Sequence, residues 1–302
     1  MKIVFMGTPD FAVASLNALV TAGFDVVGVV TAADKPAGRG QKLQESAVKQ
    51  YAVSKGIRVL QPLKLKDPVF IEELTSLKAD LQVVVAFRML PEIVWNMPRK
   101  GTINLHASLL PQYRGAAPIN HAIINGEKES GVTTFFLKHE IDTGDVIFSE
   151  SVKISDDETA GELHDDLMNI GAGLLVKTVS AIAAGDFKEQ PQPQSEVLKH
   201  APKIFKEDCL IDWNRPVSDI HNLIRGLSPY PAAFTKLNDK TLKVFKAEPE
   251  AKEPGIAPGG FLTDGKTFLK FAGKDGFIKL TDLQYEGKKR MSIEEFLRGI
   301  RL

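Results

Sequence analysis

Two polar side chains alternate with apolar ones in a predicted strand at residues 102–108. Ile103 and Leu105 are apolar, whereas Asn104 and His106 are an amide and an imidazole. Because successive side chains of a strand point to opposite faces, Asn104 and His106 should share one face. An amide can donate a hydrogen bond to a developing oxyanion, and an imidazole can carry a proton near neutral pH. The pair therefore suggests acyl-transfer chemistry.

A third candidate is Asp142, in the segment HEIDTGDVI between two further predicted strands. A carboxylate there could orient His106, hold it in the charged form and relay a proton through water. The single cysteine, Cys209, lies far along the chain, and no Gly-x-Ser-x-Gly elbow is present. The trio of Asn104, His106 and Asp142 therefore predicts direct transfer between two bound substrates, without a covalent enzyme intermediate.

Each member of the trio also has a purely structural interpretation. A histidine that ends a strand is more often structural than catalytic when only one sequence is considered. Asn104 could satisfy backbone groups of the following loop. Asp142, in the sequence DTG, is an ordinary turn residue. Residue types and spacing alone leave both interpretations open.

Short apolar segments that alternate with helical patterns must position these residues. Such strands, rich in Val and Ile, suit a parallel sheet that is covered on both faces. We therefore predict a doubly wound, mostly parallel α/β domain of the Rossmann-like kind. Ligands of such sheets bind beyond the carboxyl ends of the strands, where Asn104, His106 and the segment AFRMLP lie. The predicted strands are 2–7, 25–31, 57–62, 80–87, 102–108, 131–138 and 145–152, and the helices are 10–23, 44–55, 68–77 and 158–185.

A polar stretch with several prolines, residues 187–206, predicts a linker between two domains. Residues 1–186 would then form the catalytic domain and residues 207–302 a smaller one. A helical pattern and several short strands with turn residues between them predict a small antiparallel barrel or sandwich. The helix is expected at 216–227 and the strands at 232–237, 241–248, 259–264, 267–272 and 276–284, with a capping box at Ser292 and Glu295 before a last helix.

Composition narrows the class of protein. The chain has 302 residues, a formal net charge of zero and 43% hydrophobic residues, which is typical of a globular protein. Contacts with nucleic acid must therefore come from local basic patches. We identify no apolar stretch long enough for a membrane and no signal-peptide pattern, and a lone cysteine fits the cytoplasm. The histidines lack metal spacing, and GTPDF lacks the later glycines of a dinucleotide fingerprint, so neither a metal nor a nicotinamide is expected.

Five segments, in order, closely resemble the methionyl-tRNA formyltransferases, a branch of the folate-dependent formyltransferase family. These segments are FMGTPDFAVASL, DKPAGRGQKL, NLHASLLPQYRGAAPI, IDTGDVI and DWNRP. The Asn, His and distant Asp are shared with purine-pathway and sugar-amine formyltransferases. The PAGRG insertion and the barrel-like second domain favour the tRNA branch. The resemblance covers nearly the whole chain.

The resemblance implies that 10-formyltetrahydrofolate is the formyl donor and that methionine on initiator tRNA is the acceptor, in translation initiation. It implies that the amine attacks directly through a tetrahedral intermediate, with Asn104, His106 and Asp142 as the catalytic residues, no metal, and a monomeric, cytoplasmic enzyme with an OB-like second domain. Where the family often has an aromatic-glycine pair and a longer turn, this chain has Arg88 and Met89. The implied folate contacts are Ser108, Leu109, Leu110 and Pro111, with Arg88, Met89, Leu90 and Ile141 around the pterin.

Two basic clusters are expected to contact the tRNA, although solvated loops are the alternative interpretation of both. The first is Lys35, Arg39 and Lys42, and the second is Lys288, Lys289 and Arg290. Three other functions stay open at this point: formylation of a nucleotide or sugar amine, hydrolysis of the folate, and tRNA binding by a degenerate formyltransferase.

Overall fold

The computed structural model describes residues 1–37, 42–193 and 197–300. Contacts between residues divide the chain into two units. The first comprises Met1–Arg114, Gly131–Val152 and His164–Lys199, and the second comprises Gly115–Ser130, Lys153–Leu163 and His200–Leu302. Gly115–Ser130 and Lys153–Leu163 are thus grouped with the carboxy-terminal part of the chain.

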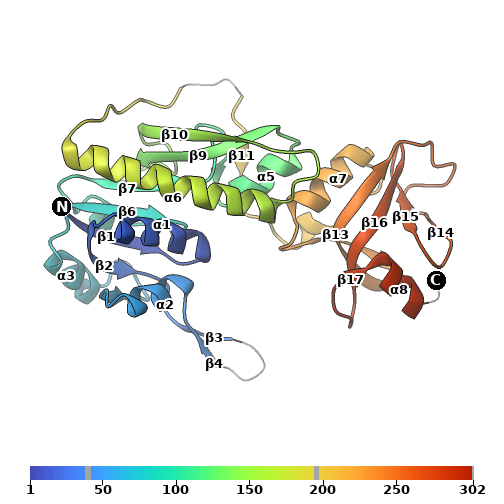
Figure 1. Cartoon of the computed structure of the whole chain (residues 1–302), viewed down its shortest axis with the longest axis horizontal. Coiled ribbons are helices and arrows are strands. Elements are labelled where there is room, and N and C mark those ends of the chain that lie inside the picture. The colour runs from blue at the N-terminus through green and yellow to red at the C-terminus, as the bar shows by residue number, and fades with distance from the viewer. Residues whose placement is uncertain (38–41, 194–196, 301–302) are drawn as a thin grey trace. The chain divides into compact units, whose positions relative to one another are not determined.

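A seven-stranded sheet forms the centre of the first unit, in the order β10-β9-β7-β6-β1-β2-β5 (Figure 1). Five neighbouring strands, from β7 to β5, are parallel, and β9 runs antiparallel to β7. The prediction of a doubly wound, mostly parallel sheet is confirmed. The strands are β1 (Lys2–Gly7), β2 (Asp25–Val30), β5 (Val59–Leu60), β6 (Leu81–Val85), β7 (Thr102–His106), β9 (Glu129–Phe136) and β10 (Val146–Lys153).

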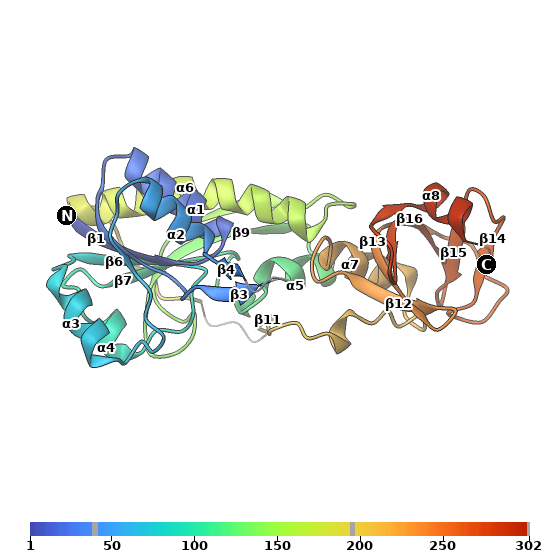
Figure 2. The ribbon, with the colours of Figure 1, turned by 90° about the horizontal axis from the view of Figure 1, so that it is seen from below.

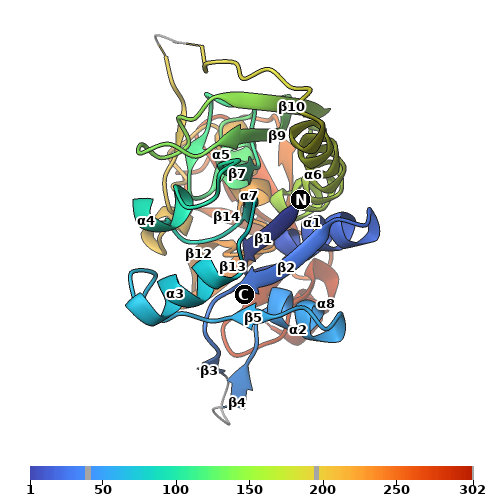
Figure 3. The same ribbon diagram turned by 90° about the vertical axis from the view of Figure 1, so that its left-hand side faces the viewer.

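Helices cover both faces of this sheet (Figure 3). Two of them begin at capping residues that the sequence supplies: the Ser46 side chain accepts from the Lys49 amide, and Asp67 accepts from the Val69 amide. Apolar side chains of the helices pack on strands such as β6, whose residues are all buried. The helices are α1 (Asp10–Thr21), α2 (Ala47–Ser54), α3 (Pro68–Ser76), α4 (Glu92–Trp95) and α6 (Ala160–Ala184).

Helix α6 is long and apolar enough to cross a membrane, by length and composition alone. The sequence led to the opposite expectation, that no apolar stretch is long enough for a membrane. Polar side chains such as Lys177 and Thr178 interrupt the apolar run, so its length was not recognised. Leu167, Leu175 and Val179 of this helix are buried in the fold. Core helices of soluble proteins meet the same criterion, so one such helix is weak evidence for a membrane segment.

Two short paired strands after β2 form a hairpin, and the first of them includes the start of the PAGRG insertion. Strand β3 (Lys35–Ala37) pairs antiparallel with β4 (Lys42–Gln44). At the base of the hairpin, the Asp34 carboxylate accepts from the Lys49 ammonium and from Gln61 Nε2, the latter at 2.7 Å. These contacts fix the residues from which the hairpin projects.

The second unit is built on an antiparallel sheet that curls, consistent with an OB-like fold (Figure 2). Its apolar core includes Trp213, whose ring stacks on Phe271 at 4.8 Å between centroids. The predicted capping box of Ser292 and Glu295 is confirmed. The strands are β12 (Ala233–Leu237), β13 (Lys240–Glu250), β14 (Phe261–Thr263), β15 (Leu269–Ala272), β16 (Phe277–Tyr285) and β17 (Met291–Ser292).

Shorter elements complete the second part of the chain. Helices α5 (Pro118–Ile124) and α7 (Val217–Gly226) pack together, and Asn120 Nδ2 donates to the Gly226 carbonyl at 2.7 Å. Helix α5 was not predicted, because its seven residues are too few to show a helical period. The other elements are α8 (Ile293–Gly299), a 3₁₀ turn at Glu207–Cys209, and a two-stranded sheet of β8 (Arg114–Gly115) and β11 (His200–Ala201).

Candidate active site

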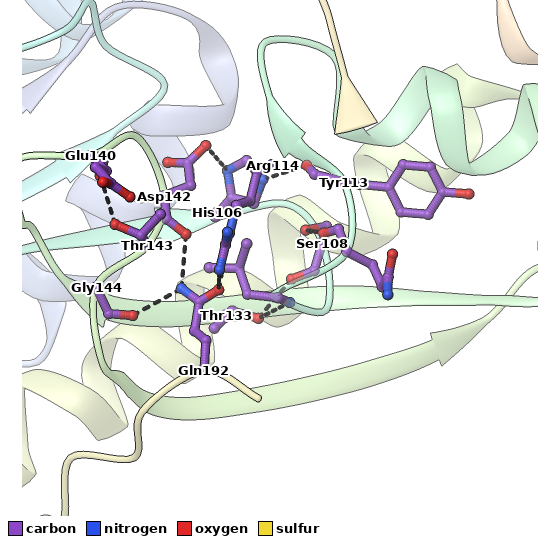
Figure 4. A network of polar contacts seen from close by, with 12 residues as sticks. His106, Ser108, Tyr113, Arg114, Thr133, Glu140, Asp142, Thr143, Gly144 and Gln192 are labelled. Atoms are coloured by element: carbon purple, nitrogen blue, oxygen red, sulfur yellow. Dashed lines mark hydrogen bonds and ion pairs between the residues drawn. The ribbon is translucent and has the colours of Figure 1, made fainter. Parts of the chain in front are cut away.

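His106, the last residue of β7, has a buried imidazole with different partners on its two ring nitrogens (Figure 4). The Nε2 atom lies 2.9 Å from the main-chain carbonyl oxygen of Tyr113. A carbonyl oxygen only accepts hydrogen bonds, so Nε2 must carry its hydrogen and donate. The Nδ1 atom is therefore the nitrogen that can exchange a proton with a substrate.

Asp142 faces this second nitrogen. Its Oδ2 atom lies 3.8 Å from His106 Nδ1, and the two side chains are only 11% and 8% exposed. This distance is longer than a hydrogen bond but well within the range of charge attraction. Because Nε2 already holds a hydrogen, a proton on Nδ1 makes the ring an imidazolium. The Asp142 carboxylate stabilises that cation.

The turn that carries Asp142 folds back along the sheet to reach His106. Phe136, the last residue of β9, pairs with Ile103, near the amino end of β7. The turn therefore leaves the sheet away from the carboxyl end of β7. Its backbone returns through Asp142, whose φ of 55° is in the left-handed region that few residues other than glycine adopt.

Gly144 permits the tight path of this turn. A Cβ atom at this position would lie 1.5 Å from the Phe136 carbonyl oxygen. No side chain can be accommodated at that distance without movement of the backbone. The glycine in the sequence DTG is thus required for the close approach of the turn to β9.

Asn104 lies two residues before His106 on β7, at a half-buried position opposite Phe135 of β9. The alternation of a strand places its side chain on the same face as His106. Within the described part of the chain, the Asn104 amide has no hydrogen-bond partner, so it is available to a bound substrate. An amide N–H and a protonated imidazole on one face can together stabilise a developing oxyanion.

The loop after β7 is held by internal hydrogen bonds. Ser108 Oγ donates to the Gln112 carbonyl at 2.7 Å. Thr133 Oγ1 donates to the Ser108 carbonyl at 2.7 Å and accepts from the Leu110 amide at 3.2 Å. Thr133 was not predicted as a site residue, although its pairing with His106 across β7 and β9 places it beside the site. Of the predicted folate contacts, Ser108 and Pro111 are buried and Leu109 and Leu110 half-buried.

The segment after β6 starts beside the same end of β7, because Val85 pairs with Leu105. The Arg88 guanidinium is engaged away from the trio, since it donates to the carbonyls of Pro62 and Leu63. Leu90 is buried in the core of the first unit. Of the other predicted pterin contacts, Met89 and Ile141 are exposed, at 74% and 57%.

Gln192, in the predicted linker, lies against the site although it was not predicted as a site residue. Its Nε2 atom donates to the main-chain carbonyls of Asp142 and Gly144, each at 2.8 Å. Its Oε1 atom accepts from Arg114, from Nε at 3.1 Å and from Nη2 at 2.5 Å. By sequence alone Arg114 is an ordinary turn residue, but its guanidinium contacts the segment that binds the Asp142 turn (Figure 4).

The residues predicted to contact tRNA have different surroundings. Lys35 of β3, Lys288 and Lys289 are all exposed. Arg39 lies outside the described residues, and Lys42 begins β4. Arg290 Nε donates to both carboxylate oxygens of Asp282, at 3.0 and 2.9 Å, and its guanidinium lies 4.2 Å from the Phe245 ring. Asp282 raises the pKa of Arg290 and offsets its charge.

Among the described residues, no group of three or more His, Cys, Asp or Glu side chains is arranged so that it could hold a metal ion. The arrangement of Asn104, His106 and Asp142 instead offers two hydrogen-bond donors and a carboxylate. These are the groups that stabilise an oxyanion and accept a proton.

Sequence comparisons match both parts of the chain to one family. Residues 1–179 match the formyl transferase model, and residues 203–301 match the model of the formyl transferase C-terminal domain. A methionyl-tRNA formyltransferase of Phocaeicola vulgatus is 58% identical over 100% of this chain and 96% of its own length. Enzymes of the same name from Bacteroides fragilis and Flavobacterium johnsoniae are 56% and 52% identical, over 100% and 99% of this chain and 96% of their own lengths.

Solved structures share the fold at lower identity. An N-formyltransferase from Helicobacter canadensis, in complex with folinic acid and dTDP-3-aminofucose, superposes with a TM-score of 0.71 at 22% identity, covering 94% of this chain and 100% of its own. HypX from Aquifex aeolicus, in complex with tetrahydrofolic acid, gives a TM-score of 0.68 at 20% identity, covering 99% of this chain and 48% of its own. These likenesses support the fold described above.

Proposed function

Because the chain belongs to the formyl transferase family, we propose that it transfers the formyl group of 10-formyltetrahydrofolate to methionine on initiator tRNA. Relatives named methionyl-tRNA formyltransferase match it over essentially its whole length at 52–58% identity. The observation that carries the proposal at the level of the site is the approach of Asp142 to His106, with Asn104 on the same strand face. This trio supplies what formyl transfer to an amine requires.

The enzyme needs two donors where negative charge develops. Asn104 donates from its amide, and His106 donates from Nδ1 while Nε2 stays bonded to Tyr113. Both hydrogen bonds strengthen as the formyl oxygen becomes an oxyanion in the tetrahedral intermediate. Before it takes up a proton, the Asp142 carboxylate attracts the positive charge of the protonated imidazole across 3.8 Å.

Proton movement completes the reaction. The neutral amino group of methionine attacks the formyl carbon directly, and a C–N bond forms. Asp142 takes the proton that the amine loses, through a water molecule. It then passes that proton back through the water to nitrogen 10 of the folate as the bond between nitrogen 10 and the formyl carbon breaks. Atoms and charges balance without a metal or a covalent enzyme intermediate, and we propose that neither takes part.

Binding of the two substrates is assigned to separate segments. The loop of Ser108, Leu109, Leu110 and Pro111 contacts the folate, with Arg88, Met89, Leu90 and Ile141 as further proposed contacts near the pterin. The curled sheet of the second unit and the β3–β4 hairpin bind tRNA, through Lys35, Arg39 and Lys42 and through Lys288, Lys289 and Arg290. Phosphate contacts of this kind make binding sensitive to salt. The enzyme works as a monomer in the cytoplasm.

The test is a formylation assay with 10-formyltetrahydrofolate and three acceptors: initiator methionyl-tRNA, elongator methionyl-tRNA and a nucleotide-linked amino sugar. We expect rapid formylation of the initiator tRNA and little of the other two. Formylation of the amino sugar in preference to the tRNA would overturn the proposal in favour of a small-amine formyltransferase. Release of formate without any acceptor would identify a hydrolase.

A further inference from the structure

We propose that Gln192 is a positioning residue that holds the Asp142 turn against His106. The inference rests on the proposed role of Asp142 in formyl transfer. Gln192 itself hydrogen-bonds to main-chain atoms of the turn, and none of its hydrogen bonds within the described residues is to the side chain of Asn104, His106 or Asp142. Its contacts link the segment bonded to Nε2 of His106 with the turn that faces Nδ1 of the same ring.

Every hydrogen-bonding position of the Gln192 amide is used. The nitrogen has two hydrogens, which go to the carbonyls of Asp142 and Gly144. The oxygen has two lone pairs, which accept from Nε and Nη2 of Arg114. Since carbonyls only accept and a guanidinium only donates, the amide can adopt just one orientation. Gln192 therefore acts as a rigid bridge between Arg114 and the turn.

This bridge closes a ring of contacts around the imidazole. His106 Nε2 donates to the carbonyl of Tyr113, and the next residue along the chain is Arg114. Arg114 binds Gln192, Gln192 binds the main chain of Asp142, and the Asp142 carboxylate faces His106 Nδ1 at 3.8 Å. A displacement of the turn would change the distance between the carboxylate and Nδ1, and the bridge opposes that displacement.

The turn needs such support. Asp142 has a φ of 55°, which costs free energy unless the surroundings hold it. Glu140 and Ile141, just before it, are exposed and pack little. Main-chain hydrogen bonds between Gln190 and Val146, at 2.8 and 2.9 Å, anchor the neighbouring segment and so deliver Gln192 to its place. The side chain of Gln190 is itself exposed.

The experiment compares Gln192→Met with Gln190→Met in the full-length enzyme. Methionine keeps the length of the side chain but removes the amide, and the control makes the same change two residues away on an exposed side chain. We expect Gln192→Met to lower kcat roughly tenfold to a hundredfold, as small misplacements of catalytic groups do. KM for both substrates and the melting temperature should stay close to those of the control.

A double-mutant cycle separates positioning from a general structural effect. If Gln192 acts through Asp142, then Gln192→Met should lower kcat little further in an Asp142→Asn enzyme. An equal loss of kcat in both backgrounds would overturn the proposal. So would wild-type kcat in Gln192→Met.

Hydrogen exchange gives a readout that does not depend on the reaction. Amides of residues 138–148 should exchange faster in Gln192→Met than in Gln190→Met or the wild type, without any substrate present. Unchanged exchange would refute the bridge even if the enzyme formylates tRNA. If exchange is faster in Gln192→Met but the wild-type protein formylates no tRNA, the bridge is supported and the proposed function is wrong.

Discussion

The Nδ1 atom of His106 lies 3.8 Å from Oδ2 of Asp142, while the opposite ring nitrogen is bonded to the Tyr113 carbonyl. Nε2 is thus used in a structural hydrogen bond, and Nδ1 is the nitrogen that can interact with a substrate. The carboxylate is close enough to favour a charged ring but does not take the Nδ1 hydrogen in a short bond. Nδ1 can therefore donate to a substrate oxygen.

Removal of either proposed oxyanion donor should slow the chemical step. Asn104→Ala and His106→Ala should each cost about 3–4 kcal/mol of transition-state stabilisation, a loss of roughly 10²–10³-fold in rate. Single-turnover formylation at saturating substrate measures this directly. The melting temperature shows whether the fold persists. Rates equal to that of the wild type in both variants would remove these residues from the mechanism.

Neutralising Asp142 should slow formyl transfer while leaving the turn in place. Asp142→Asn keeps the size of the side chain and the main-chain carbonyl that Gln192 binds, but it loses the charge facing His106. We expect kcat to fall by roughly 10²-fold or more, the usual scale for loss of a general base. Asp145→Asn, on the same turn and paired with Lys138 at 2.8 Å, is the matched control and should remain active.

A methyl group at Gly144 should distort the turn. Gly144→Ala would bring Cβ into the Phe136 carbonyl, so we expect destabilisation of about 1–3 kcal/mol and lower activity per folded molecule. Gly173→Ala is the control, because Gly173 lies in α6 and a Cβ atom added there would meet nothing within 4 Å. That change should stabilise the protein by about 0.5–1 kcal/mol. Urea unfolding measures both, and equal effects would contradict the prediction.

Acid should weaken the fold partly through His221. Burial lowers the pKa of His221, and the nearby Arg225 lowers it further, against the opposing effect of Asp157 at 3.6 Å. The unfolded chain then binds a proton at a higher pH than the folded one, so stability falls as pH drops below the ordinary histidine range. His221→Gln removes this contribution.

Urea unfolding at pH 7.5 and pH 5.5 tests this linkage. The free energy of unfolding should decrease less between these values in His221→Gln than in the wild type. The exposed His139, replaced in the same way, serves as the control and should leave the difference unchanged. An identical decrease in the His221 variant and the wild type would refute the assignment.

Arg39, which lies outside the described residues, is proposed to contact the tRNA. Arg39→Ala should raise KM for initiator tRNA far more than KM for the folate. It should also reduce the salt dependence of tRNA binding by about one counterion. Arg290→Ala should have a smaller effect on tRNA binding, because Asp282 already engages that guanidinium. Wild-type kinetics in Arg39→Ala would exclude a role for the hairpin.

Much of the sheet could be predicted from sequence because buried parallel strands are nearly apolar throughout. The same reasoning placed Asn104 and His106 on one face of β7. The path of the Asp142 turn could not be predicted, since it depends on the register that pairs Phe136 with Ile103. Gln192 was missed because nothing local distinguishes it from Gln190 in the repeated Pro-Gln pattern. Only the three-dimensional contacts separate the two.

Because residues 115–130 are grouped with the second unit, the chain is not expected to separate into two independently folding parts at the predicted linker. A fragment that ends at residue 186 would retain Asn104, His106 and Asp142. It would lack Gln192, which binds the Asp142 turn, and Gly226, whose carbonyl accepts a hydrogen bond from Asn120 of α5. We therefore expect that such a fragment does not fold by itself, although the two family models match separate parts of the chain. Recombination or truncation at that junction should yield an insoluble product, so the two parts are expected to be inherited together.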